Sequence, residues 1–436
     1  MNDKKVYIAL AADIIHPGHL KIINEGAKYG KVIVGVLTDE AISSYKRLPV
    51  FDLNTRVEIV ENIRNVSQVI TQKSVSYKEN LVLIKPDYVI HGDDWRLGAQ
   101  RKVRQGVIDI IKEWGGELIE VPYTQNLNSE KHKISLTSEL HSPDYRRALL
   151  RRMLSLKPYV NAVEASNGLT GLIVENTKII HEETSLEKEF DAMWISSLCD
   201  STFKGKPDIE LVDLTSRINT IHEIMEVTTK PIILDGDTGG KEEHFVFNVK
   251  TLERIGVSAI IIEDKTGLKK NSLFGTEVKQ TLEDPVAFAR KINAGKNALI
   301  TRDFLIFARL ESLIAGLGID DALMRAKLYI DSGADGVMIH SKDKTGEDIK
   351  SFIKAFRDYS QDIPIIVVPT TYNHLTEKDL AEMGANIIIH ANHLLRSAYP
   401  AMKKTAETIL KYGRSLEADE YCLPIKDILT LIPGGK

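Results

Sequence analysis

Few cysteines and no long apolar run occur in this chain. Its 436 residues include only Cys199 and Cys422, with no CxxC pair or metal-ligating cluster, which argues against a disulfide framework and fits a reducing compartment. No segment reaches the roughly 18 to 20 apolar residues of a membrane-spanning helix. The first apolar run is short and leads directly into a motif, so we expect no signal peptide. Together these absences predict a cytoplasmic protein.

The chain also lacks a strong excess of charge of one sign. Lysine and arginine number 57 and aspartate and glutamate 61, for a formal net charge of -4. Basic residues are interspersed with acids, as between Arg104 and Glu120, so we expect no nucleic-acid-binding face. With 43% hydrophobic and 27% charged residues the composition is that of an ordinary globular protein, and the length predicts two domains.

Apolar runs alternate with helical stretches in the first third of the chain. The runs are VYIALAA, VIVGVLT, YVIHG and ELIEVPY, and helices are expected from about Pro17 and around Thr55 to Asn65. This order predicts a parallel sheet covered on both faces, with ligands at the carboxyl ends of its strands. We expect a Rossmann-like α/β domain over residues 1–140, followed by a linker helix over residues 141–157.

A second alternation contains eight apolar runs. They are YVNAVEA, AMWISSL, PIILDGDT, AIIIEDK, ALITRDF, GVMIHSK, PIIVVPT and NIIIHAN, separated by helical segments. Eight such units predict a (β/α)8 barrel, here over residues 158–436, and barrels of this kind place catalysis at the C-terminal ends of their strands. The groups DGD, EDK, TRD, HSK and PTTYN stand at the ends of successive runs, so we expect them to point into one mouth.

Three carboxylates follow two neighbouring runs of the expected barrel. Asp235 and Asp237 in DGD and Glu263 in EDK are hard oxygen donors, the ligand type that Mg²⁺ requires. Because Mg²⁺ retains water readily, one or two direct carboxylate contacts are expected, with the remaining acid acting through water. For DGDTGG alone, the alternative is a glycine-rich turn after a strand; the neighbouring EDK favours the metal site.

The segment EDKTGLKKNS, residues 263–272, resembles the gate loop of the phosphoenolpyruvate mutase and isocitrate lyase superfamily. NGLTGLIVE, WISSL, LDGDTGG, the long FARLESLIAGLGIDD to MIHSK segment, IIVVPTTY and ANHLLRSAY resemble mutase segments in the same order, over about residues 158–411. Isocitrate and methylisocitrate lyases carry a KKCGH-type cysteine motif at the gate loop, which is absent here. Phosphonopyruvate hydrolases are closer relatives, but the asparagine of the K-x-N-S pattern, Asn271, is typical of a mutase.

The resemblance implies an isomerase that converts phosphoenolpyruvate to 3-phosphonopyruvate with Mg²⁺, and it implies a role for each matching residue. The implied metal ligands are Asp235, by direct contact, and Asp237 and Glu263, through water. The implied catalytic residues are Asp208, Lys269, Asn271, Arg309 and His340. The implied substrate-binding residues are Trp194, Ser196, Ser197, Leu198 and Ser272. Arg309 as an ion-pair partner of Glu311, and His340 as a packed histidine, remain structural alternatives.

Such chemistry needs charge stabilisation and positioning more than a protein nucleophile, because the migrating phosphoryl group passes through a loose, metaphosphate-like state. Water is the competing acceptor. A loop over residues 265–275, with Gly267 and Gly275 as hinge points, could close over the site and exclude water. We expect that closure to separate a mutase from a hydrolase.

The motif HPGH, with His16 and His19, stands directly after the first apolar run and opens a helix at Pro17. Two imidazoles three residues apart share one helix face. Together with the exposed backbone amides of the helix N-terminus they suit a polyphosphate, and they can stabilise charge at an α-phosphate under attack. The motif alone is weak, since one HxGH is common by chance.

With TDE, RVEIV, HGDDW and ISLTS, this motif resembles the HxGH cytidylyltransferases that act on small phospho-alcohols, over about residues 4–138. The resemblance implies catalytic roles for His16 and His19. It implies nucleotide binding by Asp13, His16, His19, Lys46, Arg56, Gly92, Asp93, Trp95 and Thr137. The chain departs from the family in having LAAD at residues 10–13, where glycine-threonine-phenylalanine-aspartate is usual, and in lacking the arginine and glycine that commonly precede the ISLTS position.

Both resemblances together predict a bifunctional enzyme of phosphonate biosynthesis. Its N-terminal domain would transfer CMP from CTP to a small phosphonate, 2-aminoethyl- or 2-hydroxyethylphosphonate. The expected partners are thus phosphoenolpyruvate or phosphonopyruvate, CTP and a small phosphonate, with no nucleic acid or membrane, in a homo-oligomer. The alternative is a phosphonopyruvate hydrolase or carbon–carbon lyase barrel with a degenerate, CTP-sensing regulatory N-terminal domain.

Overall fold

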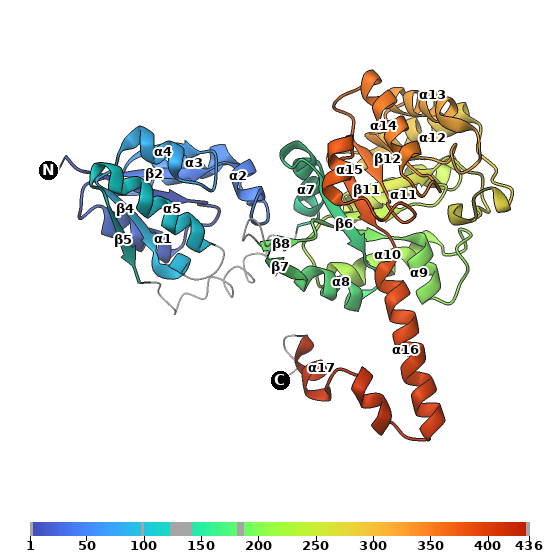
Figure 1. Ribbon diagram of the computed structural model, residues 1–436. Helices are drawn as coiled ribbons and strands as arrows, with labels where there is room; N and C mark the ends of the chain where they lie inside the picture. The colour runs from blue at the N-terminus through green and yellow to red at the C-terminus, as the bar shows by residue number, and fades with distance from the viewer. Residues whose placement is uncertain (1–2, 97–99, 123–141, 181–186, 433–436) are drawn as a thin grey trace.

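The computed structural model describes residues 3–96, 100–122, 142–180 and 187–432. It contains an N-terminal α/β domain, a barrel domain and a C-terminal helical arm (Figure 1). None of the helices in these ranges is both long and apolar enough to cross a membrane.

The N-terminal domain is built on a five-stranded parallel sheet in the order β3-β2-β1-β4-β5. Its strands are β1 Lys5–Leu10, β2 Lys31–Leu37, β3 Val66–Gln72, β4 Tyr88–Gly92 and β5 Glu117–Val121. Its helices are α1 Pro17–Gly26, α2 Asp39–Ser43, α3 Leu53–Glu61, α4 Lys78–Ile84 and α5 Arg101–Ile111. Alternate side chains of β1 enter two separate cores, Tyr7 with Leu81 on one face and Ile8 with Ile23 on the other. This confirms a parallel sheet covered on both faces.

Strand β3 and helix α4 do not appear among the elements expected from the sequence. Buried and exposed side chains do not alternate regularly along VSQVITQ, because β3 is an edge strand with several polar or half-exposed side chains. Helix α4 has only one buried residue, Leu81. Both segments therefore show too weak an apolar period to stand out.

The barrel domain is a closed ring of eight parallel strands, as expected (Figure 1). They are β6 Val160–Glu164, β9 Ala192–Ile195, β10 Ile232–Asp235, β11 Ala259–Glu263, β12 Leu305–Leu310, β13 Gly336–Ile339, β14 Ile365–Val367 and β15 Ile387–His390. The surrounding helices are α8 Gly168–Asn176, α9 Ser197–Phe203, α10 Leu214–Met225, α11 Glu242–Ile255, α12 Pro285–Ala298, α13 Gly318–Asp331, α14 Glu347–Tyr359 and α15 Glu377–Met383. A short antiparallel pair, β7 Lys178–Ile180 and β8 Glu187–Glu189, lies outside the ring.

One of the eight expected strands was placed wrongly. ALITRDF is not a strand: α12 ends at Ala298, Ile300 is 91% exposed, and the fifth of the expected barrel strands is instead LIFARL, β12. The TRD group therefore precedes its strand and lies at the N-terminal end of the barrel, away from the mouth. Two apolar runs follow one another closely here, and their pattern alone does not show which of them is buried.

Helix α7, Pro143–Leu156, begins at an N-cap formed by Ser142 and closes the N-terminal end of the barrel. Its Leu150 and Met153 belong to the same core as the barrel-interior residues Val160 and Phe307. Arginines of α7 donate to backbone carbonyls that precede β10 and β11. This helix, expected as a linker, thus packs on the barrel.

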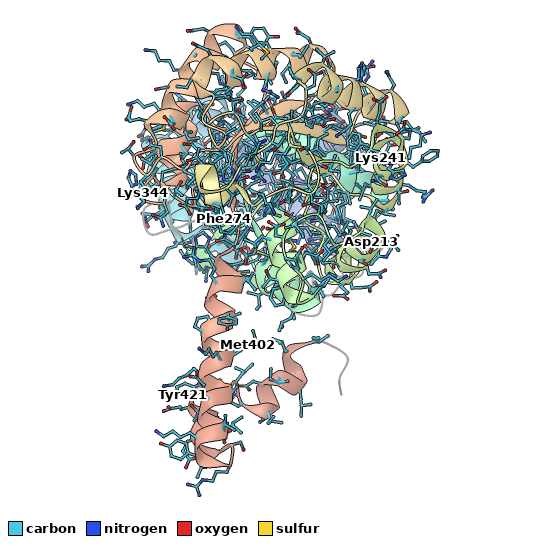
Figure 2. The ribbon with its side chains drawn as sticks, turned by 90° about the vertical axis from the view of Figure 1, so that its right-hand side faces the viewer. Asp213, Lys241, Phe274, Lys344, Met402 and Tyr421 are labelled. Carbon is cyan, nitrogen blue, oxygen red and sulfur yellow. The ribbon has the colours of Figure 1, made fainter. Side chains whose placement is uncertain are left out.

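The chain ends in an arm that consists of α16 His393–Tyr412, a short helical turn at Leu416–Tyr421 and α17 Ile425–Leu431. Figures 1 and 2 show α16 extending away from the barrel, with Met402 and Tyr421 beyond it. Helix α16 has no buried residue.

Candidate active site

The expected acids stand at neighbouring strand ends of the barrel. Asp235 is the last residue of β10 and Glu263 the last residue of β11, and the two strands pair in parallel. Both carboxylates therefore open at the C-terminal end of the barrel. Asp237 follows two residues later with a φ of 53°, a left-handed conformation that aspartate adopts more readily than most residues.

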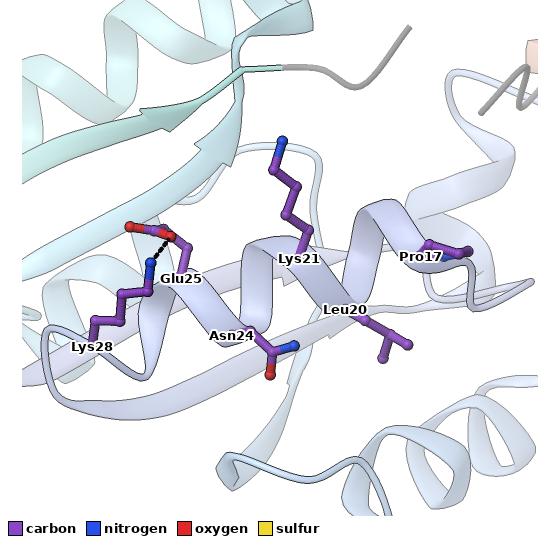
Figure 3. A pocket seen from close by; sticks show the side chains of 6 residues that line it. All are labelled: Pro17, Leu20, Lys21, Asn24, Glu25 and Lys28. Carbon is purple, nitrogen blue, oxygen red and sulfur yellow. Dashed lines mark hydrogen bonds and ion pairs between the residues drawn. The ribbon is translucent and has the colours of Figure 1, made fainter. Parts of the chain in front are cut away.

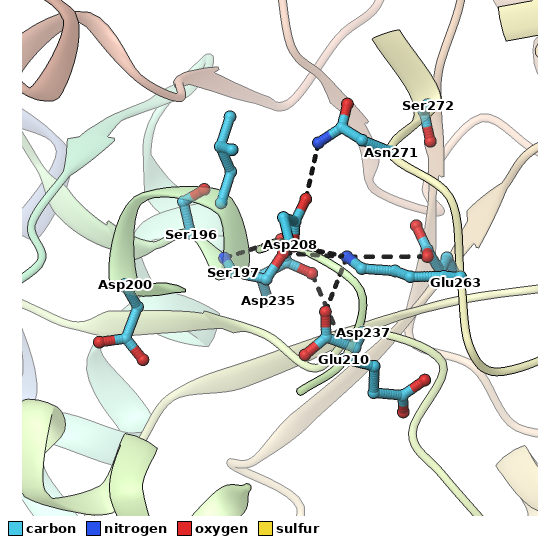
Figure 4. Close-up of polar contacts among 12 residues, drawn as sticks. Ser196, Ser197, Asp200, Asp208, Glu210, Asp235, Asp237, Glu263, Asn271 and Ser272 are labelled. Carbon is cyan, nitrogen blue, oxygen red and sulfur yellow. Dashed lines mark hydrogen bonds and ion pairs between the residues drawn. The ribbon is translucent and has the colours of Figure 1, made fainter. Parts of the chain in front are cut away.

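Figure 4 shows Asp208, Asp235, Asp237 and Glu263 gathered around one point. The side chain of Lys269 enters this group of acids from the gate loop. Its Nζ lies 2.7 Å from Asp237 Oδ1, 3.3 Å from Asp208 Oδ1 and 3.8 Å from Glu263 Oε1. It also donates to Ser197 Oγ at 3.0 Å. Burial alone would lower the pKa of Lys269, but Asp237 and Glu263 raise it well above its ordinary value. The ammonium thus stays charged and neutralises part of the cluster.

Three carboxylate oxygens, Asp208 Oδ1, Asp237 Oδ1 and Glu263 Oε1, have the ammonium of Lys269 as their charged partner and accept no further hydrogen bond. No trio of acidic, histidine or cysteine side chains in the described ranges has the spacing of a preformed metal site, and Lys269 stands among the acids instead. The chemistry of these oxygens nevertheless fits Mg²⁺, because three hard oxygens from three carboxylates face one point, which the ammonium of Lys269 now holds. A small displacement of the Lys269 ammonium would allow a cation to bind these three oxygens.

Burial affects the two strand-end carboxylates differently. It raises the pKa of Glu263 to about 7, and the charges of Lys269 and Arg309 only partly oppose it. For Asp235 the same burial is outweighed by Lys269 and Arg309, which lower the pKa to about 2. Asp235 also accepts hydrogen bonds from Ser197 N at 3.1 Å and Ser197 Oγ at 2.8 Å, which fix its orientation. Asp235 is therefore the carboxylate best prepared to remain an anion.

Arg309 joins the acids to a second group of polar residues on β12 and the gate loop. Its Nη1 lies 3.3 Å from Glu263 Oε2, and its Nε lies 2.5 Å from Glu311 Oε1. Its Nη2 donates to Ser272 Oγ at 2.8 Å and faces His340 Nδ1 at 3.0 Å. The ion pair with Glu311, the structural alternative for Arg309, is thus present. Arg309 nevertheless also borders the pocket described below.

The state of His340 follows from its neighbours. Burial lowers its pKa, and the nearby guanidinium of Arg309 lowers it further. His340 Nδ1 lies 3.0 Å from Arg309 Nη2, which can only donate, and 3.3 Å from Glu311 Oε1, which can only accept; the shorter contact favours the neutral tautomer with its proton on Nε2. A neutral imidazole with one N–H can donate a hydrogen bond to an anion in the pocket.

The gate loop is held closed by polar contacts along its length. Asn271 Nδ2 donates to Asp208 Oδ2 at 2.6 Å. Lys265 Nζ donates to Ser272 Oγ at 2.6 Å, and Ser272 Oγ donates to Glu311 Oε2 at 2.6 Å. Three of the residues that the motif singled out therefore connect the loop to both groups of polar residues.

A single pocket at the mouth of the barrel gathers nearly all of the expected barrel residues. Of these, only Asp237 does not line it, and it contacts Lys269 directly. The expected residues that line the pocket are Trp194, Ser196, Ser197, Leu198, Asp208, Asp235, Glu263, Lys269, Asn271, Ser272, Arg309 and His340. Leu273, Met338, Val368, Thr370, Ala391 and Asn392 complete it.

Two further charges support this pocket: Glu311, which the sequence offers only as a structural partner of Arg309, and Arg217, which no motif singles out. Glu311 is fully buried and binds Arg309 and Lys265. Arg217 reaches from α10 to Asp237 at 2.9 Å. Arg309 is near the end of β12 and Glu311 directly follows the strand, and this spacing of two residues is a signal that both face the same side. Nothing in the pattern of α10 sets Arg217 apart.

In the N-terminal domain, the motif HPGH forms the start of α1. His16 Nδ1 accepts from Gly18 N at 3.1 Å, His19 Nδ1 accepts from His16 N at 3.4 Å, and the two rings stack with centroids 3.8 Å apart. A Cβ on Gly18 would lie 2.8 Å from the His16 ring, so the glycine makes room for this arrangement. The two imidazoles thus sit side by side at a helix N-terminus, as the motif predicts.

The remaining expected nucleotide-binding residues cluster at the carboxyl ends of β1, β2 and β4. Asp13 Oδ1 accepts from Val50 N at 2.7 Å. Arg56 is fully buried and donates to the carbonyls of Ala11 and Leu37, so it supports the strand ends from within. Lys46 follows α2, with its Nζ 5.4 Å from the centre of the Tyr45 ring.

At the end of β4, Gly92 and Asp93 lead into a short helical turn that contains Trp95. The indole of Trp95 is only 1% exposed, stacks on His91 at 3.8 Å and donates to Glu120 at 2.9 Å. Its side chain therefore stabilises this strand end. Thr137 lies outside the described residues.

A shallow depression on the outer side of α1 carries no chemistry of its own (Figure 3). All the residues that line it belong to α1 or the turn after it, namely Pro17, Leu20, Lys21, Asn24, Glu25 and Lys28. Lys28 and Glu25 form an exposed ion pair there at 2.6 Å. We assign it no function.

The fold and the pocket define a (β/α)8-barrel enzyme with an acidic subsite, a basic subsite and a closing loop, attached to a Rossmann-like domain with a histidine pair. The profile of the phosphoenolpyruvate phosphomutase family matches residues 150–410, and that of the cytidylyltransferase-like family matches residues 11–147. The chain belongs to the phosphoenolpyruvate phosphomutase family and carries a cytidylyltransferase-like domain at its N-terminal side.

Individual relatives agree with this assignment. A phosphoenolpyruvate phosphomutase of Tetrahymena pyriformis is 32% identical over 283 residues, which cover 65% of this chain and 89% of the relative. A phosphonopyruvate hydrolase of Variovorax sp. is 35% identical over 244 residues, which cover 56% of this chain and 83% of the relative. The solved phosphoenolpyruvate phosphomutase of Streptomyces platensis subsp. rosaceus is 31% identical with a TM-score of 0.58, covering 65% of this chain and 93% of that one.

Proposed function

We propose that the barrel interconverts phosphoenolpyruvate and 3-phosphonopyruvate with Mg²⁺. The observation that carries this proposal is the gate loop, whose Lys269, Asn271 and Ser272 reach the acids and Arg309 inside one closed pocket. A loose phosphoryl transfer state needs such surrounding charges and the exclusion of water. A solved phosphonopyruvate hydrolase with oxalate and Mg²⁺, 30% identical with a TM-score of 0.56, supports a metal on this fold.

In this mechanism the bond between phosphorus and the enol oxygen breaks, and a bond between phosphorus and C3 of the same molecule forms. Mg²⁺, held directly by Asp235 and through water by Asp237 and Glu263, would supply positive charge near the transferring group. Arg309 and the Nε2–H of His340 donate to the phosphoryl oxygens.

The other pocket residues position the substrate and keep water out. The substrate carboxylate would lie along Trp194, Ser196, Ser197 and Leu198, where α9 begins. The pyruvate portion then presents either its enol oxygen or C3 to the phosphorus, and the closed loop holds Asn271 over the migrating group. Asp208, which accepts from Asn271, orients that amide.

Phosphorus NMR of phosphonopyruvate with Mg²⁺ and the full chain tests this function. The phosphonopyruvate signal should give way to that of phosphoenolpyruvate, and Asp235→Ala and Asn271→Ala should each slow the conversion by about 100-fold or more. If both variants convert phosphonopyruvate as fast as the parent, the proposed site is wrong.

Phosphonopyruvate hydrolysis is the second candidate activity, and the 35% identity to a hydrolase favours it specifically. The same spectra separate the two, because hydrolysis gives inorganic phosphate and pyruvate. A carbon–carbon lyase would need no phosphorus chemistry at all, and the absence of a cysteine from the KKNS segment argues against the lyases that carry one.

For the N-terminal domain we propose transfer of CMP from CTP to a small phosphonate such as 2-aminoethyl- or 2-hydroxyethylphosphonate. A phosphonate oxygen attacks the α-phosphorus of CTP, and pyrophosphate leaves with the other two phosphorus atoms. The paired His16 and His19 at the start of α1 support this proposal, since both can donate to the charge that develops there.

Pyrophosphate release from CTP, Mg²⁺ and each candidate phosphonate tests this activity. His16→Asn and His19→Asn should abolish it without altering the barrel reaction. The alternative is a regulatory domain that senses CTP. Tight CTP binding without pyrophosphate release, together with a changed mutase rate, would favour this regulatory role over CMP transfer.

A further inference from the structure

The segment over residues 44–52, between α2 and α3, contains the expected triphosphate-binding Lys46 and extends to the barrel domain. The next residue, Arg47, directs its guanidinium to two barrel carboxylates. Its Nε donates to Glu189 Oε1 and its Nη2 to Glu189 Oε2, both at 2.9 Å, and its Nη1 lies 2.7 Å from Glu175 Oε1. The two parallel bonds to Glu189 form the bidentate geometry that fixes both partners most strongly.

Apolar and backbone contacts reinforce this attachment. Leu48 is 6% exposed and belongs to the same core as Leu149 and Leu150 of α7. Arg152, also on α7, donates to Pro49 O at 2.6 Å. Consecutive residues of the segment are therefore fixed against the closed, N-terminal end of the barrel.

The opposite side of the segment is bound to the strand ends of the nucleotide domain. Asp13, three residues before His16, accepts from the amides of Val50 and Phe51 at 2.7 and 3.2 Å. Arg152 also pairs with Asp39 at 3.0 Å, and Asp39 binds the buried Arg56 that supports the carbonyls after β1 and β2. A continuous set of contacts thus runs from Glu189 to the loop that precedes the histidine pair.

We propose that Arg47 and Arg152 are positioning residues for the N-terminal site: the barrel holds the 44–52 segment in the conformation that presents Lys46 to the triphosphate of a nucleotide. This inference rests on the nucleotide-dependent function proposed above and deepens it. It makes the barrel a structural part of the nucleotide site, although the pocket at the barrel mouth lies at the other end of the strands. The charges that face Arg47 are Glu175, Glu189 and the neighbouring Lys230, which pairs with Glu189 at 2.8 Å.

The test compares Arg47→Gln with the parent full-length chain. CTP binding, measured by calorimetry with Mg²⁺, should weaken by about tenfold or more, because an unanchored segment must be ordered on binding. Mutase turnover should stay unchanged. Arg151→Gln is the control, since Arg151 stands on α7 next to Arg152 but pairs with Asp335 of the barrel instead of the 44–52 segment, and it should leave both quantities unchanged.

A conservative variant separates a specific ion pair from a general loss of folding. Arg47→Lys keeps a positive charge within reach of Glu175 and Glu189 and should retain part of the CTP affinity that Arg47→Gln loses. Amide hydrogen exchange gives a second measurement that needs no nucleotide: Val50 and Phe51 should exchange faster in Arg47→Gln than in the parent.

The outcomes are distinct. Unchanged CTP affinity and unchanged exchange in Arg47→Gln would overturn the positioning role. Faster exchange with unchanged CTP affinity would also overturn it, because the segment would then be anchored without serving the nucleotide. A parent chain that does not bind CTP would instead remove the proposed nucleotide function, and this inference with it.

Discussion

Lys269 brings a positive charge into a group of acids that would otherwise repel one another. Asp208, Asp237 and Glu263 all lie within 3.8 Å of its Nζ, and the side chain is 4% exposed. The neighbouring Lys270 is exposed and belongs to the same loop. Lys269 and Lys270 are therefore adjacent lysines in opposite environments: Lys269 is buried in the site and Lys270 is exposed to solvent.

We expect Lys269→Gln to lower mutase turnover by about 100-fold or more, because a charge that contacts the reacting group is lost. Without metal, the variant should also lose about 3 kcal/mol of unfolding free energy, since buried carboxylates are left without their partner. Addition of Mg²⁺ should restore part of that loss by binding to the folded state. Phosphorus NMR rates and urea unfolding with and without Mg²⁺ measure both effects.

Lys270→Gln is the control and should match the parent in rate and in stability. If Lys269→Gln retains turnover within twofold of the parent, or if its stability without metal is unchanged, the ammonium does not play the role assigned to it here.

His340 links the stability of the barrel to pH. Its pKa is lowered by burial and by Arg309, so the folded protein binds the proton less tightly than the unfolded chain does. The resulting stability is fully present above the ordinary histidine pKa of about 6.5 and is lost as pH falls through the lower folded value.

In His340→Asn this acid-side contribution should be absent. The difference in unfolding free energy between parent and variant should therefore shrink as pH falls from 8 towards 5, as measured by urea unfolding at about half-unit steps. His374→Asn, at an exposed position, should leave the pH profile of the parent unchanged. A parent–variant difference that stays constant across this range would mean that His340 does not titrate with folding.

The gate loop acts as a unit because Ser272 lies at the centre of its contacts. Ser272 Oγ accepts from Lys265 and Arg309 and donates to Glu311. Deletion of that single oxygen removes three hydrogen bonds at once and leaves the buried charges with fewer partners. The closed loop should then open more often and admit water.

We expect Ser272→Ala to convert part of its phosphonopyruvate to pyruvate and inorganic phosphate, products that the parent forms at most in traces. Phosphorus NMR measures the ratio of phosphate to phosphoenolpyruvate directly. Thr266→Ala removes a hydroxyl at the exposed base of the same loop and should leave that ratio unchanged. If Ser272→Ala slows the reaction without any phosphate, the loop governs positioning alone and does not exclude water.

Both domains and most barrel strands were predictable, because buried parallel strands leave continuous apolar runs. GVMIHSK and AIIIEDK appear as strands where expected. The strand ALITRDF was misplaced because the exposed Ile300 looks as apolar as a buried isoleucine. The pocket residues were predictable from the motif and from the strand ends, and the pairing of Arg309 with Glu311 was foreseen as an alternative. Arg217 was not predictable, since only the folded chain brings its guanidinium from α10 to Asp237.

The barrel pocket and the attachment of the N-terminal domain lie at different ends of the barrel strands. The pocket opens at the C-terminal ends, whereas Arg47 and α7 hold the N-terminal domain against the opposite end. The pairing of Arg47 with Glu189, 142 residues apart in sequence, leaves no local pattern to predict it. Apolar side chains fill the barrel interior between the pocket and α7, so the strands separate the pocket from the N-terminal domain.

The C-terminal arm exposes apolar side chains that a single chain leaves in water. On α16 alone Tyr399, Met402 and Leu410 are 64%, 57% and 85% exposed, and the arm continues with apolar residues of α17 (Figure 2). Exposed apolar surface of this extent is typical of an interface. Since these side chains stay exposed in the described chain, we propose that a second copy of the chain covers them, which is the kind of assembly that the family resemblance implies.

Light scattering coupled to size-exclusion chromatography tests this assembly. The parent should have a mass that is a multiple of the monomer, and the double variant Met402→Glu with Leu410→Glu should shift to the monomer, because burial of two carboxylates in an apolar interface is unfavourable. Lys403→Gln changes an exposed lysine of the same helix that pairs only with Glu407, so it should keep the parental mass. A parent that is monomeric at micromolar concentration would contradict the inference that a second copy of the chain covers the arm.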